Sequence, residues 1–281
     1  MQEIDDFPSS PSATANSAEL YVAYLKARDV VAKTPRKLVD GVSNKTIRDL
    51  TSHFYIQAKS GNALLRSKLD GPGSLGALWL SKVESLARWF VALNDVPVFD
   101  GLTSEQMSSM AKLSANAENA RELEGALLKL GVVLIHEPAI PGAKIDGAAF
   151  KLFNGTPVVA LSLRYPRVDH YWFTLMHELA HISLHFDSLD DPIVDDLDVS
   201  GASLIEKQAD KAASDALIPR TKWRTCAAKA SNKLDDVRDF AREVGVAEEI
   251  VAGRICREKN RHDLFSNIIN RVNMREVIFG K

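Results

Sequence analysis

The sequence contains few cysteines. Only two occur, Cys226 and Cys256, and no Cys-x-x-Cys pair exists anywhere in the chain. A zinc ribbon held by four thiolates is therefore excluded, because its ligands come as such pairs. Two isolated thiols fit a reducing compartment better than a secreted disulfide scaffold.

The sequence also lacks signals for export or membrane insertion. Residues 1–17, MQEIDDFPSSPSATANS, are acidic and rich in serine and proline, without the basic start and apolar core of a signal peptide. No stretch approaches the roughly 18 uninterrupted apolar residues that a membrane span needs. We therefore expect a disordered tail over residues 1–17, no membrane partner and a cytoplasmic location.

Neither sign of charge is in excess. The chain has 35 Lys and Arg against 37 Asp and Glu, a formal net charge of −2. This balance gives no global signal for a nucleic-acid partner, although a local basic surface that contacts DNA stays possible. With 281 residues, 46% of them hydrophobic, the chain can form one large or two small globular domains.

Hydrophobic periodicity predicts a mostly helical α+β protein with one small sheet. The segment 75–93 has helical spacing, and Thr103 and Asn116 are typical N-caps of the helices that follow. Three apolar runs, 131–137, 145–153 and 156–165, predict strands, and Asn154-Gly155 between the last two favours a hairpin with a type I′ turn. We therefore predict a three-stranded antiparallel sheet packed on a helix over residues 169–186.

That predicted helix carries the sequence His177-Glu178-Leu179-Ala180-His181. Two histidines four residues apart share one helical face, so both can bind a single tetrahedral zinc ion. Glu178 is rotated by about 100° and can instead take a proton from the water that attacks a carbonyl. The alternative is a buried helix whose histidines form local hydrogen bonds. The apolar residues before the motif make this alternative less favourable, because polar groups crowded into a core are costly without a metal.

The motif needs a third ligand, and several residues come into question. The offset at which metzincins have a third histidine holds Asp187, so that pattern is excluded. His185 lies a further turn along the helix, too far for the same tetrahedron, and we expect it to be a packing or surface histidine. Glu206 and Asp210 share a face of the next helix. Glu206 could complete the zinc site and Asp210 could hydrogen-bond a ligating histidine, but ordinary surface charge has the same spacing.

Several other features have two interpretations each. The strand 156–165 could be a sheet edge that binds an extended substrate, or an internal strand. Tyr165 could donate to a developing oxyanion or only pack, and Cys226 could be a fourth, inhibitory zinc ligand or a buried thiol. The acidic run 187–198 and the basic cluster 254–261 could bind partners or form solvated surface.

In combination, these motifs resemble a known family. The segments FTLMHELAHISLH and IEKQADKAASDALIP resemble the ImmA/IrrE-type metallopeptidase domain, more narrowly those fused to HigA-type antitoxin or XRE-type regulators. The resemblance covers about residues 120–265. It implies zinc held by His177, His181 and Glu206, Glu178 as the general base, and Asp210 in the position of a motif residue beside the ligands. It also implies cleavage of a helix-turn-helix repressor that controls stress, mobile-element or defence genes.

The resemblance leads to a prediction of domain organisation. We expect a helical region over residues 18–115, with at best a degenerate helix-turn-helix at 42–61, and a metallopeptidase domain over 116–281. A separate repressor as protein substrate is therefore favoured over direct operator binding. The alternative function is a non-enzymatic antitoxin or transcriptional regulator in which zinc is structural or absent.

Overall fold

The computed structural model describes residues 74–190, 192–195, 204–261 and 263–280. The chain divides into two compact units, Met1–Ser74 and Leu75–Lys281, and the elements below belong to the second, apart from Ser74 at the start of the first helix. The predicted tail at 1–17 and the predicted helices before residue 74 lie outside the described residues. The predicted boundary between residues 115 and 116 stays a prediction.

The helices before the sheet begin where the sequence predicts. Thr103 forms a capping box with Gln106, in which each side chain accepts from the other's backbone N–H. Asn116 accepts from Glu118 N and caps a second short helix. The segments are α5 (Ser74–Leu93), α6 (Ser104–Ala111), the 3-10 helices η1 (Lys112–Ala115) and η2 (Ala117–Glu122), and α7 (Leu123–Leu128).

Within the described residues the sheet has four strands and is mixed, so the prediction of three antiparallel strands is wrong in these two respects. Its strands are β1 (Val133–His136), β2 (Gly147–Lys151), β3 (Pro157–Leu161) and β4 (Ile193–Asp195), in the order β1-β3-β2-β4. β3 pairs in parallel with β1 and antiparallel with β2, and β4 pairs antiparallel with β2. After β1, the loop 137–146 leads to β2, which lies two positions away in the sheet. The tight hairpin after β2 then places β3 in the position between β1 and β2.

The hairpin at Asn154-Gly155 is confirmed, but its turn is not type I′. Gly155 has φ +87°, whereas Asn154 is not among the residues with positive φ. Gly155 N donates to Leu152 O, and Leu152 N donates to Thr156 O, which gives a three-residue loop. This is a type I turn followed by a left-handed glycine, the next most common hairpin connection.

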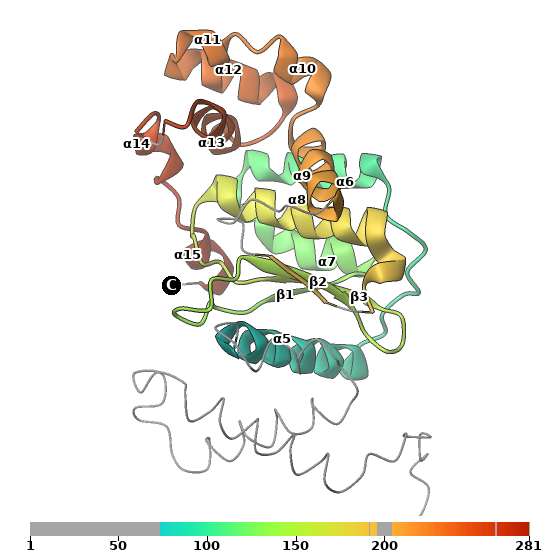
Figure 1. Ribbon diagram of the computed structural model, residues 1–281. Coiled ribbons are helices and arrows are strands. Elements are labelled where there is room, and N and C mark those ends of the chain that lie inside the picture. Colours follow the sequence, from blue (N-terminus) through green and yellow to red (C-terminus); the bar gives the residue numbers. More distant parts are fainter. Residues whose placement is uncertain (1–73, 191, 196–203, 262, 281) are drawn as a thin grey trace, which may run out of the picture. The chain divides into compact units, whose positions relative to one another are not determined.

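The sheet lies between two layers of helix, as Figure 1 shows. On one face, Trp79, Leu80 and Val83 of α5 pack with Val158 and Ala160 of β3. The alternate β3 residues Val159 and Leu161 belong to the larger core on the other face. Because both faces of β3 are covered, its sequence PVVAL is apolar throughout instead of alternating with polar residues.

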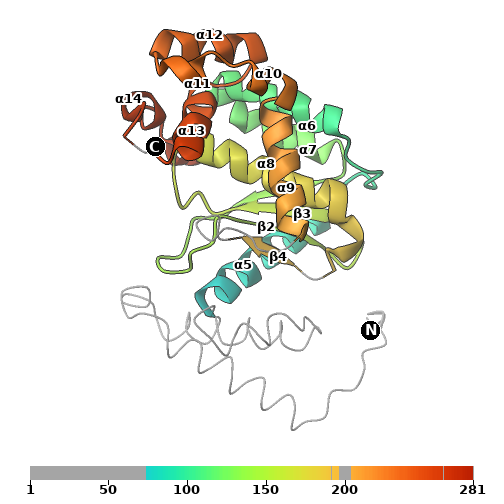
Figure 2. The same ribbon diagram turned by 45° about the horizontal axis from the view of Figure 1, so that its top comes forward.

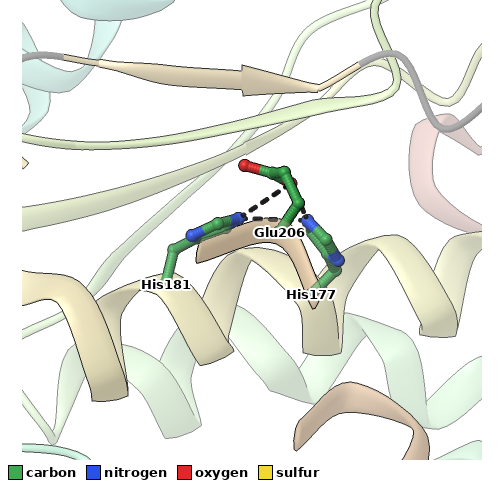
Figure 3. Close-up of side chains that lie close together, drawn as sticks. All are labelled: His177, His181 and Glu206. Atoms are coloured by element: carbon green, nitrogen blue, oxygen red, sulfur yellow. Dashed lines mark hydrogen bonds and ion pairs between the residues drawn. The ribbon is translucent and has the colours of Figure 1, made fainter. Parts of the chain in front are cut away.

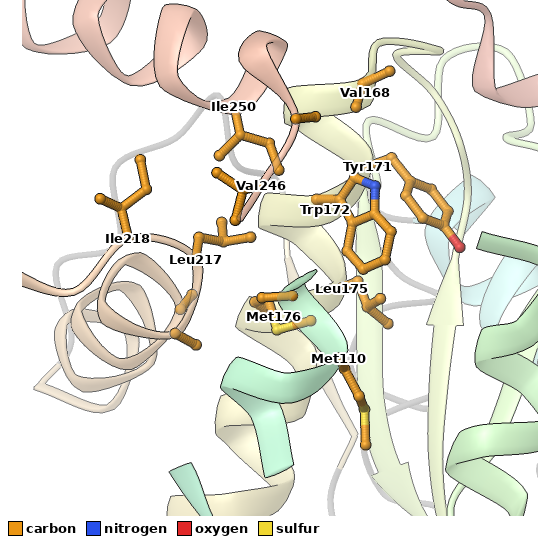
Figure 4. Packing of buried hydrophobic residues seen from close by; sticks show 14 of the residues in the cluster. Met110, Val168, Tyr171, Trp172, Leu175, Met176, Leu217, Ile218, Val246 and Ile250 are labelled. Carbon is orange, nitrogen blue, oxygen red and sulfur yellow. The ribbon is translucent and has the colours of Figure 1, made fainter. Parts of the chain in front are cut away.

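Helix α8 (Val168–His185) is the centre of the larger core. Most of its side chains are buried because the sheet covers one side of it and the later helices cover the other. Figure 4 shows Trp172, Leu175 and Met176 of α8 among residues from these helices. In Figure 2, α9 (Leu204–Leu217) crosses α8, and the C-terminal helices follow. They are α10 (Arg220–Arg224), α11 (Ala228–Ser231), α12 (Leu234–Val244), α13 (Glu248–Lys259), α14 (Ser266–Ile269) and α15 (Met274–Phe279).

The predicted fold class, mostly helical α+β with a small sheet, is confirmed. One element within the predicted acidic loop, β4, was missed because three residues are too short for a recognisable alternating pattern. Among the described helices, none combines the length and the apolar character that crossing a bilayer requires.

Candidate metal centre

Three side chains from two helices meet at one point. His177 and His181 project from the same face of α8, and Glu206 reaches them from the first turn of α9 (Figure 3). His177 Nε2 lies 3.0 Å from His181 Nε2 and 3.1 Å from Glu206 Oε2, and His181 Nε2 lies 3.6 Å from the same oxygen. Among the described residues, these three form the group able to hold a metal ion.

The spacing of the three atoms fits a tetrahedral ion. Ligands at about 2.0–2.2 Å from a tetrahedral zinc lie about 3.3–3.6 Å from one another. The observed separations of 3.0, 3.1 and 3.6 Å are within a few tenths of an ångström of these edges. The metal-capable group (His177, His181 and Glu206) therefore needs little rearrangement to bind zinc.

The chemistry of the donors also favours a cation. His177 Nδ1 lies 3.1 Å from Asp210 Oδ1, and an ionised carboxylate only accepts hydrogen bonds. A neutral His177 therefore carries its proton on Nδ1 and has a lone pair on Nε2. That lone pair points at Glu206 Oε2, another acceptor. Two acceptors at 3.1 Å repel each other unless a proton or a metal ion lies between them.

Glu178 follows the first histidine but faces the sheet. Its side chain is fully buried, and a Cβ on Gly147 of β2 would lie only 2.3 Å from Glu178 Oε1. The same Cβ would lie 2.9 Å from Thr174 Cγ2, one turn earlier on α8. The absence of a side chain at Gly147 thus creates the space for the Glu178 carboxylate.

His185 has a specific contact that the sequence did not suggest. Its Nδ1 lies 3.2 Å from His181 Nδ1, the nitrogen that faces away from the metal-capable group, and its Nε2 lies 3.0 Å from Gln208 Oε1. His185 is not a member of the group, as expected from its distance along the helix. It is also not merely a surface or packing histidine.

A cavity of about 640 Å³ adjoins the metal-capable group. One of its lining residues is Asp210, which contacts His177. The cavity lies between α8, α9 and α13, and its apolar wall includes Phe173, whose ring centroid is 6.1 Å from that of His177. Arg257 of α13 places its guanidinium 4.6 Å from the centre of the Phe173 ring. The cavity is large enough for one or more side chains of a bound peptide.

Close contact at a second glycine holds α13 against α8. A Cβ on Gly253 would lie 2.1 Å from Asp169 Oδ2, and Asp169 also pairs with Arg167 at the start of α8. The helix with the two histidines is held further along by Ser183, whose hydroxyl donates to Leu102 O at 2.6 Å. α8 is therefore fixed near both ends.

The structure selects among several alternatives that the sequence left open. In the described part of the sheet β3 is an internal strand, which selects this alternative for 156–165 over a substrate-binding edge, and β1 and β4 are the outer strands. Cys226 is a buried thiol outside the metal-capable group, and burial raises its pKa. Tyr165 packs its ring on His170, with centroids 4.6 Å apart, and Arg164 lies over it.

The basic cluster near the end of α13 has local partners. Arg254 lies 3.4 Å from Glu258, Lys259 donates to Asn232 and Arg261 pairs with Asp263. Most of these cationic side chains therefore contact acidic or neutral polar side chains, as is typical of a solvated helix end. The pattern adds no support for a nucleic-acid surface at this place.

Residues 128–255 match the family model of the IrrE N-terminal-like peptidase domain. This part of the chain is an ImmA/IrrE-type domain. The match includes β1, the hairpin, α8, α9 and most of α13, and thus every residue of the metal-capable group. The family is one of peptidases, so the match supports a metallopeptidase-type enzyme. No curated protein matches the chain significantly, and the narrower resemblance to HigA-type fusions stays a prediction.

Proposed function

We propose that the chain is a zinc-dependent endopeptidase that cleaves a regulatory protein, a helix-turn-helix repressor or an antitoxin-like partner. The single observation that carries the proposal is the convergence of His177, His181 and Glu206 within 3.6 Å beside the buried Glu178. The family match over residues 128–255 supports the peptidase class. The kind of substrate rests on the resemblance of the HELAH and IEKQAD segments.

The protein's own side chains divide the chemistry between them. His177, His181 and Glu206 would hold zinc, which when bound polarises a carbonyl and lowers the pKa of water. Glu178 lies next to His177 on α8 and accepts a proton from the attacking water, then returns it to the leaving amine. Its burial against Gly147 keeps the carboxylate in one orientation.

Strand β4 is the edge at which an extended peptide can bind. In the sheet order β4 is the outer strand beside β2, and its Asp195 is paired with Gly147. Gly147 in turn contacts Glu178. A substrate strand added outside β4 would therefore lie one strand spacing, roughly 4.8 Å, from β4 and two spacings, roughly 9.6 Å, from β2, the strand that contacts Glu178.

The adjoining cavity offers a place for a substrate side chain. Phe173, Leu217, Ile218 and Ile250 supply apolar lining, and the cavity reaches Asp210 beside His177. A side chain bound there would help to fix the register of the peptide over the reacting group. Specificity for one regulatory protein would follow from this cavity together with the β4 edge.

The test is co-expression with a small helix-turn-helix protein encoded beside this chain. Wild type should cut the partner, and Glu178→Gln should retain about one zinc per chain but lose cleavage by a factor of about 10²–10⁴. Equal cleavage by Glu178→Gln would overturn the assigned mechanism. Purified wild-type protein with neither zinc nor cleavage would indicate the non-enzymatic regulator instead.

A further inference from the structure

We propose that His185 and Gln208 are positioning residues that fix the tautomer of His181, so that its Nε2 is presented to the metal. The proposal rests on the proposed function, because it takes His181 as a ligand. It goes further in giving a defined role to two side chains that are not ligands themselves.

The contacts form an unbroken chain from α8 to α9. His181 Nδ1 lies 3.2 Å from His185 Nδ1, one helical turn later, with the ring centroids 5.3 Å apart. His185 Nε2 lies 3.0 Å from Gln208 Oε1. Gln208 is on α9, the same helix that supplies Glu206.

The positions of the protons follow from this order of contacts. A neutral imidazole has one N–H and one lone pair, and a metal takes the lone pair. Since His181 Nε2 faces His177 and Glu206, its proton must be on Nδ1 and donate to His185 Nδ1. His185 then accepts on Nδ1, carries its own proton on Nε2 and donates it to the carbonyl oxygen of Gln208. Each nitrogen in the chain has one consistent role.

Burial makes this arrangement matter for His181. The His181 side chain is 0% exposed, so bulk water cannot easily replace the acceptor behind it. Without His185, the other tautomer, with a proton on Nε2, would compete and would block the metal position. Gln208 is exposed, and water can substitute for its carbonyl. We therefore expect His185 to contribute more than Gln208.

The two histidine ligands are thus supported in different ways. Behind His177 stands the Asp210 carboxylate, an obligatory acceptor that fixes the tautomer by itself. His185, behind His181, is neutral and can accept or donate, so it needs Gln208 to define its own tautomer. Groups behind metal ligands of this kind typically change metal affinity by about 10–100-fold.

The first experiment compares zinc affinity, measured by competition with a chromophoric chelator on the full chain. His185→Leu removes the acceptor and should weaken zinc binding by about 10–100-fold. His185→Asn places an oxygen near the position of Nδ1 and should restore affinity to within about threefold of wild type, since it can accept the same hydrogen bond. Gln208→Leu should have a smaller effect than His185→Leu.

A matched control separates this role from a general effect on the helix. His170→Leu makes the same change near the beginning of α8, away from the metal-capable group, and should leave zinc affinity unchanged. Equal affinity of His185→Leu and wild type would overturn the proposal. So would equal weakening by His185→Leu and His185→Asn, which is the result of a merely structural role.

The second experiment observes the tautomers directly. Long-range ¹⁵N–¹H correlations of the zinc-loaded wild type should show the His181 proton on Nδ1 and the His185 proton on Nε2. A His185 proton on Nδ1 would refute the relay even if zinc is bound. Failure of the wild type to bind zinc at all would instead refute the proposed function, and with it the premise of the relay.

Discussion

Replacing Gly147 by alanine tests whether the missing side chain on β2 makes room for Glu178, the proposed general base. The new Cβ would lie 2.3 Å from Glu178 Oε1, 2.9 Å from Thr174 Cγ2 and 3.0 Å from Glu178 Cδ. Contacts of this kind are ordinary only from 3.4 Å, so the oxygen must move by about 1.1 Å. Glu178 is fully buried, so its carboxylate cannot simply turn into bulk solvent.

The displacement gives the expected magnitudes. Overpacking a buried site in this way costs about 1–3 kcal/mol of the free energy of unfolding. For a domain of this size, each kcal/mol corresponds to about 2–4 °C, so the Tm should fall by about 2–12 °C. A misplacement of about 1 Å at a reacting group can reduce the rate about 100-fold. Cleavage should fall by this factor while the zinc content stays the same.

The decisive assay is thermal unfolding of the metal-free protein as a double-mutant cycle. In a Glu178→Ala background the principal clash is gone, so Gly147→Ala should lower the Tm by less than half as much as in wild type. Gly125→Ala is the matched control, because nothing lies within 4 Å of its new Cβ, and it should leave the Tm unchanged or raise it slightly. An equal loss from Gly147→Ala in both backgrounds would show that the Glu178 carboxylate is not what the new Cβ meets.

Three further predictions concern Asp210, the adjoining cavity and the two cysteines. Asp210→Ala should weaken zinc binding by about 10–100-fold in the chelator competition, and Asp210→Asn by less, because asparagine can still accept from His177 Nδ1. Ser214→Trp should fill part of the cavity and raise the KM for the partner protein with zinc content unchanged; an unaltered KM would remove the cavity from the substrate path. Burial raises the pKa of both Cys226 and Cys256, so little thiolate exists at about pH 7–8. A thiol reagent should therefore label the native protein slowly and the unfolded protein fast, and rapid native labelling would contradict the burial.

The placement of the two histidines could be predicted because it depends on the regular repeat of the α-helix. The spacing of His177 and His181 places both on one face of any α-helix, whatever surrounds it. The same holds for Glu206 and Asp210, but their spacing alone does not reveal that the two helices cross at this point. That part of the prediction depended on the resemblance to a family, which the match over residues 128–255 bears out for the domain.

What the sequence did not reveal depends on contacts between distant segments. An alternating or apolar pattern marks a strand but contains no information on its direction, so the parallel pairing of β1 with β3 was missed. The role of Gly147 could not be predicted from the sequence, because it depends on the closeness of this glycine to Glu178 in the folded chain. His185 was interpreted as a packing or surface residue because the sequence shows its distance along the helix, not the orientation of its ring.

Every donor of the metal-capable group comes from α8 or α9, and the chain that connects these helices contains the edge strand β4. A bound metal would therefore join the two ends of this connection, much as a disulfide closes a loop. A covalent cross-link over the roughly 25 residues from His181 to Glu206 would contribute roughly 3.5 kcal/mol by loop closure. In the loaded protein, opening this edge of the sheet would be coupled to keeping the ion. Loss of the ion would then remove a link that spans β4.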